Sequence, residues 1–320
     1  MRGRVIKKGT NVYLQIGKDV YLYNERQQPL GAGAMGVVYK GMDVSTNTPV
    51  AIKRVMDQYA DIPEIRYRAY QEADLMFRHP NLVEMLGCCE LAPNRGPLFL
   101  VSNFVNGENI DTFINRHVRN LPNAEKRICE LFYPVLDALA YIHQKGIIHM
   151  DIKPSNIMME NGRNVRLMDL GIANISDAVN TSTSGMMGTP KYAAPEQFSD
   201  IHRNSKLTAS TDIYEAGVTL YELITKHNPF SANSVAEAKE KHSEMILPMT
   251  QGLSKPVYDV IRKATDIYPE GRYQSAGEMK MALMRAVVTP VPPRRNWWPA
   301  ICIFIAVCIA VVLVLLFINE

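Results

Sequence analysis

Residues 147–156 read IIHMDIKPSN and place an aspartate (Asp151), a lysine (Lys153) and an asparagine (Asn156) within one short stretch. The preceding residues 124–146, AEKRICELFYPVLDALAYIHQKG, repeat apolar side chains at spacings of three and four and end at a glycine, which predicts a helix. Any one of the three polar residues alone is more often a solvated loop residue. Whether they form a functional site depends on the motifs elsewhere in the sequence.

The two halves of the chain have different patterns. Short strand-like segments fill the first half, at 11–16 (NVYLQI), 18–23 (KDVYLY), 36–44 (GVVYKGMDV) and 49–55 (PVAIKRV). After about residue 108 helix-like patterns follow, including a buried helix predicted for DIYEAGVTLYELIT at 212–225. Strands first and helices second predict two unequal lobes.

A glycine-rich stretch, GAGAMG, contains Gly31, Gly33 and Gly36. Such a pattern also opens dinucleotide-binding folds, and Asp57 lies about the right distance downstream to contact a ribose. A dinucleotide-binding turn must continue into a helix, whereas VVYKG is β-branched and aromatic and the following NTP breaks helices. The loop is therefore predicted to join two strands and to offer backbone N–H groups to a triphosphate.

Four further motifs follow this loop in order: VAIK ending at Lys53, HMDIKPSN at 149–156, MDLG containing Asp169, and AAPE at 193–196. In order and spacing they resemble the eukaryotic-type (Hanks-type) protein kinases over residues 25–286. GVVYKG, GTPKYAAPEQF and RYQSAGEM are most similar to the bacterial membrane-anchored Ser/Thr kinases of that family. The resemblance implies an α+β, bilobal protein-kinase fold with a small β-rich N-lobe and a larger helical C-lobe.

The resemblance also implies ATP and Mg²⁺ as cofactors and a protein substrate. Because every group in phosphoryl transfer is negatively charged, catalysis depends on positioning and on neutralisation by fixed cations. Asp151 is expected to accept the hydrogen bond of the substrate hydroxyl and Lys153 to contact the γ-phosphate. Asn156 and Asp169 are expected to bind Mg²⁺ through hard oxygen atoms. Lys153 in DIKPSN and Thr189 in GTPKY are similar to the Ser/Thr kinases, so the expected acceptor is serine or threonine.

The nucleotide site follows from the same resemblance. Lys53 is expected to hold the α- and β-phosphates with Glu72 as its ion-pair partner. The stretch after Glu72 is about two residues shorter than is usual in the family, so Glu64 and Glu84 remain alternatives. The predicted ATP-binding residues are Leu30, Gly31, Gly33, Gly36, Val38, Ala51, Lys53, Glu72, Asn103, Val105 and Met158.

Asn103 and Val105 belong to LVSNFVNG at 100–107, the predicted connection between the lobes, where backbone groups would meet the adenine edge. A strand and loop without ligand contact is the alternative for this segment. Glu196 and Arg272 are predicted to form a buried ion pair of the large lobe, and His149 and Asp212 are interpreted as scaffold.

Met150 departs from the family pattern, in which an arginine precedes the catalytic aspartate and binds a phosphate on the activation loop. Asn174 stands near the place of a second basic residue, and neither side chain replaces a guanidinium. The loop SDAVNTSTSGMMGT at 176–189 is nevertheless rich in hydroxyl groups: Thr181, Ser182, Thr183, Ser184 and Thr189. Loop phosphorylation is expected not to be required for activity, and control is expected through location or self-association at a membrane.

The composition of the 320 residues, 47% hydrophobic and 21% charged, is that of a globular protein. A net charge of +3 with scattered Lys and Arg gives no reason to expect a nucleic-acid partner. The opening residues are too polar for a signal peptide. The N-terminal part is therefore expected in the cytosol.

Residues 300–318, AICIFIAVCIAVVLVLLFI, contain no charge and are long enough as a helix to cross a hydrocarbon core of about 30 Å. Trp297 and Trp298 suit the headgroup region, and Arg294 and Arg295 precede them. A buried core helix is the alternative. The predicted order is an N-terminal β extension (1–24), a kinase domain (25–286), a Pro-rich juxtamembrane linker (287–299) and one transmembrane helix (300–318). The kinase domain is expected in the cytoplasm and the C-terminus on the opposite side of the bilayer.

Two functions compete for this sequence. One is an active Ser/Thr protein kinase at a membrane, and the other is a pseudokinase or membrane scaffold that binds ATP or a partner without phosphotransfer. Lys53, Asp151 and Asp169 are all present, whereas pseudokinases usually lack one of them. The sequence therefore favours the active kinase.

Overall fold

The computed structural model describes residues 2–33, 36–60, 62–63, 66–67, 69–70, 73, 77–92, 95–168, 189–198 and 207–288. The chain forms two compact units, residues 1–287 and 288–320. The predicted membrane segment 300–318 lies outside the described residues. Among the helices within those residues, none combines the length and the apolar character needed to cross a bilayer.

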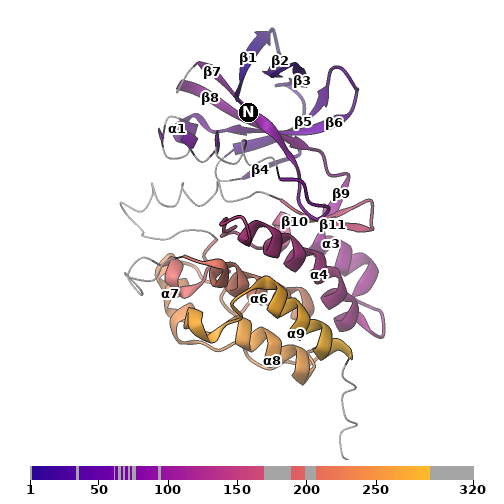
Figure 1. Ribbon diagram of the computed structural model, residues 1–320, viewed down its shortest axis with the longest axis vertical. Coiled ribbons are helices and arrows are strands. Elements are labelled where there is room, and N and C mark those ends of the chain that lie inside the picture. Colours follow the sequence, from indigo (N-terminus) through magenta and orange to yellow (C-terminus); the bar gives the residue numbers. More distant parts are fainter. Residues whose placement is uncertain are drawn as a thin grey trace, which may run out of the picture. The chain divides into compact units, whose positions relative to one another are not determined.

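Strands fill the first third of the chain and helices most of the remainder, which confirms the predicted order (Figure 1). The strands are β1 (Arg2–Lys8), β2 (Asn11–Ile16), β3 (Asp19–Asn24), β4 (Gly31–Gly33), β5 (Gly36–Asp43), β6 (Pro49–Val55), β7 (Met85–Ala92), β8 (Arg95–Asn103), β9 (Gly107–Asn109), β10 (Ile157–Glu160) and β11 (Asn164–Leu167). The helices are α1 (Asp57–Ala60), α3 (Ile110–Phe113), α4 (Ala124–His143), α6 (Ala209–Thr225), α7 (Val235–Glu244), α8 (Lys255–Ala264) and α9 (Ala276–Val288), with short turns η1 (Ile114–Val118), η2 (Pro154–Asn156), η3 (Pro195–Gln197) and η4 (Pro269–Gly271).

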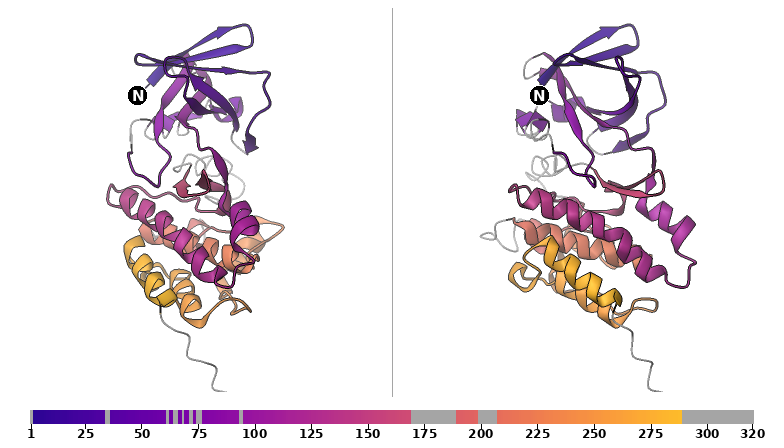
Figure 2. Two further views of the ribbon diagram at one scale, coloured as in Figure 1. Left: turned by 90° about the vertical axis from the view of Figure 1, so that its right-hand side faces the viewer. Right: turned by 45° about the vertical axis from the view of Figure 1, so that its right-hand side comes forward.

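The larger sheet has the strand order β3-β2-β1-β7-β8-β6-β5-β4, and an additional pairing of β3 with β5 closes it on itself. Strand β1 pairs with β7 in parallel, with Arg2, Gly3 and Arg4 opposite Cys88, Cys89 and Glu90. The first three strands can be followed in indigo in Figure 2. Alternate side chains of β2 and β3 are buried in one core with those of β6 and β8, including Leu14, Ile52 and Phe99.

Gly3 shows how closely the extension packs. A Cβ atom at this position would lie 2.1 Å from the carbonyl oxygen of Gln15 and 2.7 Å from Sγ of Cys89. Only glycine therefore permits β1 to enter between β2 and β7.

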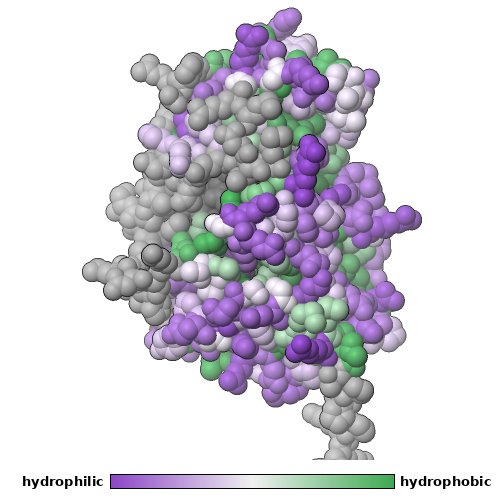
Figure 3. Space-filling view, in the orientation of Figure 1, coloured by the Kyte–Doolittle hydropathy of each residue, from purple (hydrophilic) through white to green (hydrophobic). Residues whose placement is uncertain are grey.

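The helical part is centred on α6, of whose 17 residues 14 are buried. Helices α4 and α8 pack against α6, and the antiparallel strands β9, β10 and β11 form a separate three-stranded sheet that also contacts α3 and α4 (Figure 1). The face drawn in Figure 3 is mostly hydrophilic over the described residues, as expected for a packed domain whose apolar stripes are buried.

Arg272 and Glu196 confirm the predicted buried ion pair. Both side chains have no exposed surface, and two parallel bonds of 2.7 and 2.9 Å join the guanidinium to the carboxylate. The guanidinium also donates to the carbonyl oxygens of Ser210 and Asp266 at 3.0 and 2.7 Å. The pair therefore ties η3 and η4 to the N-terminal end of α6.

Candidate active site

The segment that contains Asp151 lies between α4 and β10, and α6 holds its backbone. The carboxylate of Asp212 accepts the N–H groups of His149 and Met150 at 2.8 and 2.7 Å, and it lies 2.7 Å from Nε2 of His143. Met150 has a φ of 61°, in the left-handed region that a side chain other than glycine rarely adopts. Such a conformation persists where its surroundings enforce it, and Asp212 supplies that constraint here.

Three predicted residues contact the Asp151 carboxylate. Lys153 Nζ lies 2.7 Å from Oδ2, and Asn156 Nδ2 donates to the same oxygen at 2.8 Å. Thr189 Oγ1 donates to Oδ1 at 2.7 Å and accepts a hydrogen bond of 2.7 Å from Lys153. Residues 38 positions apart are thus joined directly at one buried carboxylate.

These contacts set the charge of Asp151. Burial raises the pKa of its carboxyl, but the Lys153 ammonium, the hydrogen bonds from Lys153 and Thr189, and nearby His149 together bring the pKa below its ordinary value. Asp151 is therefore ionised at neutral pH, as an acceptor for a substrate hydroxyl must be.

The side chain of Asn156 is anchored through its amide nitrogen. Its Nδ2 donates both to the carbonyl oxygen and to Oδ2 of Asp151, each at 2.8 Å, so the amide oxygen Oδ1 is its remaining polar atom. An amide oxygen beside a carboxylate is a hard donor of the kind that Mg²⁺ prefers. Asp169, the other predicted ligand, lies outside the described residues, and the part of the chain that the structure describes contains no group of three His, Cys, Asp or Glu side chains able to hold a metal.

The glycine-rich stretch joins two antiparallel strands, as predicted: Gly31 pairs with Val38 and Gly33 with Gly36. Among the described residues, no atom lies within 4 Å of the position that a Cβ would take at Gly31 or Gly33, so these residues leave the backbone there open to a ligand such as a phosphate. At Gly36 a Cβ would lie 2.4 Å from the carbonyl oxygen of Arg54, so this position requires glycine.

The other predicted nucleotide residues lie on the neighbouring strands. Lys53 is on β6 opposite Val38 of β5, and Ala51, two residues earlier, faces the same side of the sheet. Leu30 donates its N–H to the carbonyl oxygen of Val38 at 2.8 Å, and half of its side chain is exposed. Met158 lies on β10, in the smaller sheet. Glu72, Thr181, Ser182, Thr183 and Ser184 lie outside the described residues.

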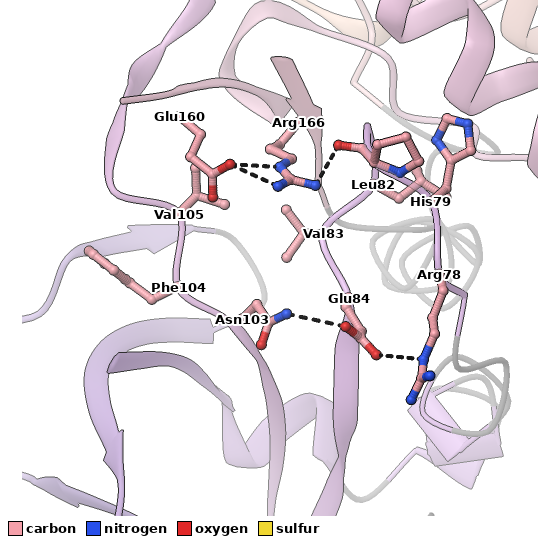
Figure 4. Close-up of a pocket in the computed structure, with 11 residues that line it drawn as sticks. Arg78, His79, Leu82, Val83, Glu84, Asn103, Phe104, Val105, Glu160 and Arg166 are labelled. Atoms are coloured by element: carbon pink, nitrogen blue, oxygen red, sulfur yellow. Dashed lines mark hydrogen bonds and ion pairs between the residues drawn. The ribbon is translucent and has the colours of Figure 1, made fainter. Parts of the chain in front are cut away.

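The predicted connection between the lobes borders a pocket of about 430 Å³ (Figure 4). Asn103 donates its backbone N–H to the carbonyl oxygen of Glu84 at 3.0 Å, and its side chain points toward the Glu84 carboxylate at 3.4 Å. Glu84 also pairs with Arg78 at 3.2 Å, so this alternative partner for Lys53 is engaged elsewhere. The Asn103 N–H is thus already occupied, which leaves its carbonyl and the Val105 backbone as the groups available to an adenine edge.

Glu215 is absent from the predicted site residues. It lies three residues after Asp212 in α6, is 1% exposed, and accepts the N–H of Ile152 at 2.7 Å. The available signal was an acidic residue within a helix predicted to be buried, because buried carboxyl groups are rare unless they have hydrogen-bond partners.

Comparison with known proteins identifies the family to which this site belongs. Residues 24–284 match the protein kinase domain family. The chain belongs to the protein kinase family. The match covers the motifs around Lys53, Asp151 and Asp169 and leaves β1 and β2 of the extension outside it.

Two relatives with similar sequences are bacterial kinases. This kinase domain is 34% identical over 266 residues to the serine/threonine-protein kinase PknB of Mycobacterium tuberculosis, covering 80% of this chain and 41% of PknB. It is 30% identical over 278 residues to the serine/threonine-protein kinase PrkC of Bacillus subtilis, covering 85% of this chain and 41% of PrkC. The chain therefore spans less than half the length of these relatives.

Solved structures show the same fold. The kinase domain of M. tuberculosis PknI matches with a TM-score of 0.62 and 22% identity, over 82% of this chain and 94% of that one. At this level of identity the match shows the protein-kinase fold and nothing finer.

Proposed function

We propose that the chain is an ATP- and Mg²⁺-dependent protein kinase that transfers the γ-phosphoryl group to serine or threonine of a protein substrate. The observation that supports this most is the buried, ionised Asp151 carboxylate, fixed by Lys153, Asn156 and Thr189 at 2.7 to 2.8 Å. The names of PknB and PrkC support serine or threonine as the acceptor.

Each residue has a separate role in the proposed reaction. Asp151 accepts the hydrogen bond of the substrate hydroxyl and orients its oxygen toward the phosphate. Lys153, at the edge of the same cluster, neutralises charge on the transferred group, and Lys53 does so on the phosphates behind it. Asn156 and Asp169 would hold Mg²⁺, which supplies further neutralisation when bound with ATP. Thr189 joins the C-terminal end of the activation loop to this centre.

Replacement of Asp151 by asparagine tests the proposal. Asp151→Asn keeps the size of the side chain but removes the negative charge and replaces one accepting oxygen by an amide donor, so transfer to a generic Ser/Thr acceptor should fall by about a hundredfold or more while ATP binding persists. Asp259→Asn is the matched control, because Asp259 lies on the surface of α8 in an ion pair with Lys255. Radiolabelled transfer and nucleotide binding would be measured on both variants. A wild-type protein that binds Mg·ATP and transfers nothing would instead establish the pseudokinase.

We also propose that residues 300–318 anchor the domain to a membrane, on the strength of their uncharged sequence and flanking Trp and Arg residues. A reporter fused after Glu320 is expected to face away from the cytosol, and the full chain is expected to resist extraction from membranes by salt. A chain ending at residue 299 serves as the control. A cytosolic reporter at Glu320 would refute the spanning helix.

A further inference from the structure

Helix α6 contacts the backbone on both sides of Asp151 through one row of polar side chains. Asp212, Glu215 and Thr219 are spaced by three and four residues and therefore share a face of the helix. Asp212 accepts the N–H groups of residues 149 and 150, Glu215 accepts that of Ile152, and Thr219 Oγ1 donates to the Ile152 carbonyl oxygen at 2.8 Å. Three backbone N–H groups and one carbonyl are thus fixed to one buried helix.

The peptide unit between Asp151 and Ile152 is held at both of its polar atoms. Its N–H donates to Glu215 Oε2 at 2.7 Å, and its carbonyl oxygen accepts from Asn156 Nδ2 at 2.8 Å. Because a peptide unit is planar, two bonds on opposite edges fix its orientation. That orientation determines the direction in which the adjoining Asp151 side chain points.

Burying the Glu215 carboxyl costs free energy that only its hydrogen bonds can offset. Burial, and next the nearby charge of Asp212, raise the pKa of the Glu215 carboxyl well above its ordinary value. Within the described part of the chain its partners are the Ile152 N–H and the side chain of Gln197, and no ion pair joins it to a lysine or arginine there. An apolar side chain would avoid this cost, so the carboxyl is explained by the groups that it binds.

We propose that Glu215 is a positioning residue for phosphotransfer, which fixes the Asp151–Ile152 peptide by accepting its N–H and so orients the Asp151 carboxylate. The inference rests on the proposed kinase function. It adds a residue outside the catalytic motifs, and through Gln197 of η3 it connects the Asp151 segment to the residues that follow Thr189.

The test compares Glu215→Ala with a control for lost stability, Ala216→Gly, at the next position of the same buried helix. In the full chain, Glu215→Ala is expected to lower kcat by about ten- to a hundredfold, the equivalent of one hydrogen bond to a carboxyl group, with KM for ATP changed less than about twofold. Ala216→Gly, matched by its melting temperature, is expected to keep kcat within about threefold.

Two further measurements separate positioning from folding. Gln197 donates to the same carboxyl, and its Oε1 accepts the Ala194 N–H at 2.5 Å. The paired exchange Glu215→Gln with Gln197→Glu therefore retains complementary groups and is expected to recover kcat to within about fivefold of the wild type. If Glu215→Ala does not fold, Glu215→Gln alone is the substitute, and the paired exchange is expected to exceed its kcat.

Amide hydrogen exchange of residues 149–152 provides a readout that needs no activity. Glu215→Ala is expected to speed exchange at Ile152 by at least tenfold, whereas Ala216→Gly should not do so selectively. Unchanged Ile152 exchange, or a kcat within threefold of the wild type in Glu215→Ala, would overturn the inference. An inactive wild type that still shows the selective exchange effect would overturn the kinase proposal and leave the Glu215 contact established.

Discussion

Met150 combines a left-handed backbone with a buried thioether, next to the residue on which the proposed reaction depends. Its side chain is 8% exposed, and its N–H is bound by Asp212 at 2.7 Å. A thioether offers a phosphate none of the charge-assisted hydrogen bonds that a guanidinium provides, each of which contributes about 1.5 to 3 kcal/mol. The conformation of this segment is instead fixed by α6, through the hydrogen bonds to Asp212.

The methionine at position 150 leads to a prediction about phosphorylation of the activation loop. Replacing Thr181, Ser182, Thr183 and Ser184 together by alanine should change transfer to a fixed substrate by less than about threefold, because Met150 cannot bind a loop phosphate. Thr189→Val is the positive control, since it removes two bonds at the Asp151 and Lys153 cluster and should lower activity by about tenfold or more. A drop above tenfold in the quadruple variant, reversed by acidic replacements, would mean that another basic residue receives the phosphate.

At the scale of elements, the Glu196–Arg272 ion pair stabilises the packing of η3 and η4 against α6. Arg272→Met should lower the free energy of unfolding by about 3 to 5 kcal/mol, because it leaves the Glu196 carboxylate buried without its partner. Urea unfolding of the single variant and of Glu196→Leu with Arg272→Met would measure this. The double variant is expected to be more stable than Arg272→Met, and equal stability of the two would contradict the argument.

The elements also show what the sequence could predict. Strands β2 and β6 begin and end at the residues expected from alternation, and α4 and α6 follow the expected helical periodicity, because these signals are local. Strand β1 has no such signal, since RGRVIKK is mostly polar and its parallel partner is β7. The same holds within the site. The resemblance to kinases predicted Asp151, Lys153, Asn156 and Thr189, which lie together in the structure, whereas the bond from Glu215 to Ile152 depends on how α6 packs against the segment that contains Asp151.

At the scale of the whole unit, the N-terminal extension is part of the core of the strand-rich lobe. Leu14 is fully buried with residues of β6 and β8, so Leu14→Ala should lower the free energy of unfolding by about 2 to 5 kcal/mol. Leu121→Ala, at a side chain that is 40% exposed, is the control and should change it by less than about 1 kcal/mol. Chemical unfolding would measure both. A chain starting at residue 25 that unfolds at the wild-type denaturant concentration would show that the extension is a separate appendage.

The parallel pairing of β1 with β7 also has a consequence for biosynthesis. Residues 2–8 leave the ribosome before residues 85–92, so the parallel partner of β1 is complete only after residue 92 has been made. Strands β1, β2 and β3 can form antiparallel hairpins among themselves during that interval. The edge of β1 that later pairs with β7 has no partner strand until then. An unpaired strand edge on a nascent chain is a site for mispairing with other chains. We therefore expect the yield of folded protein to depend on the speed of translation between β1 and β7 and on chaperones that bind nascent chains.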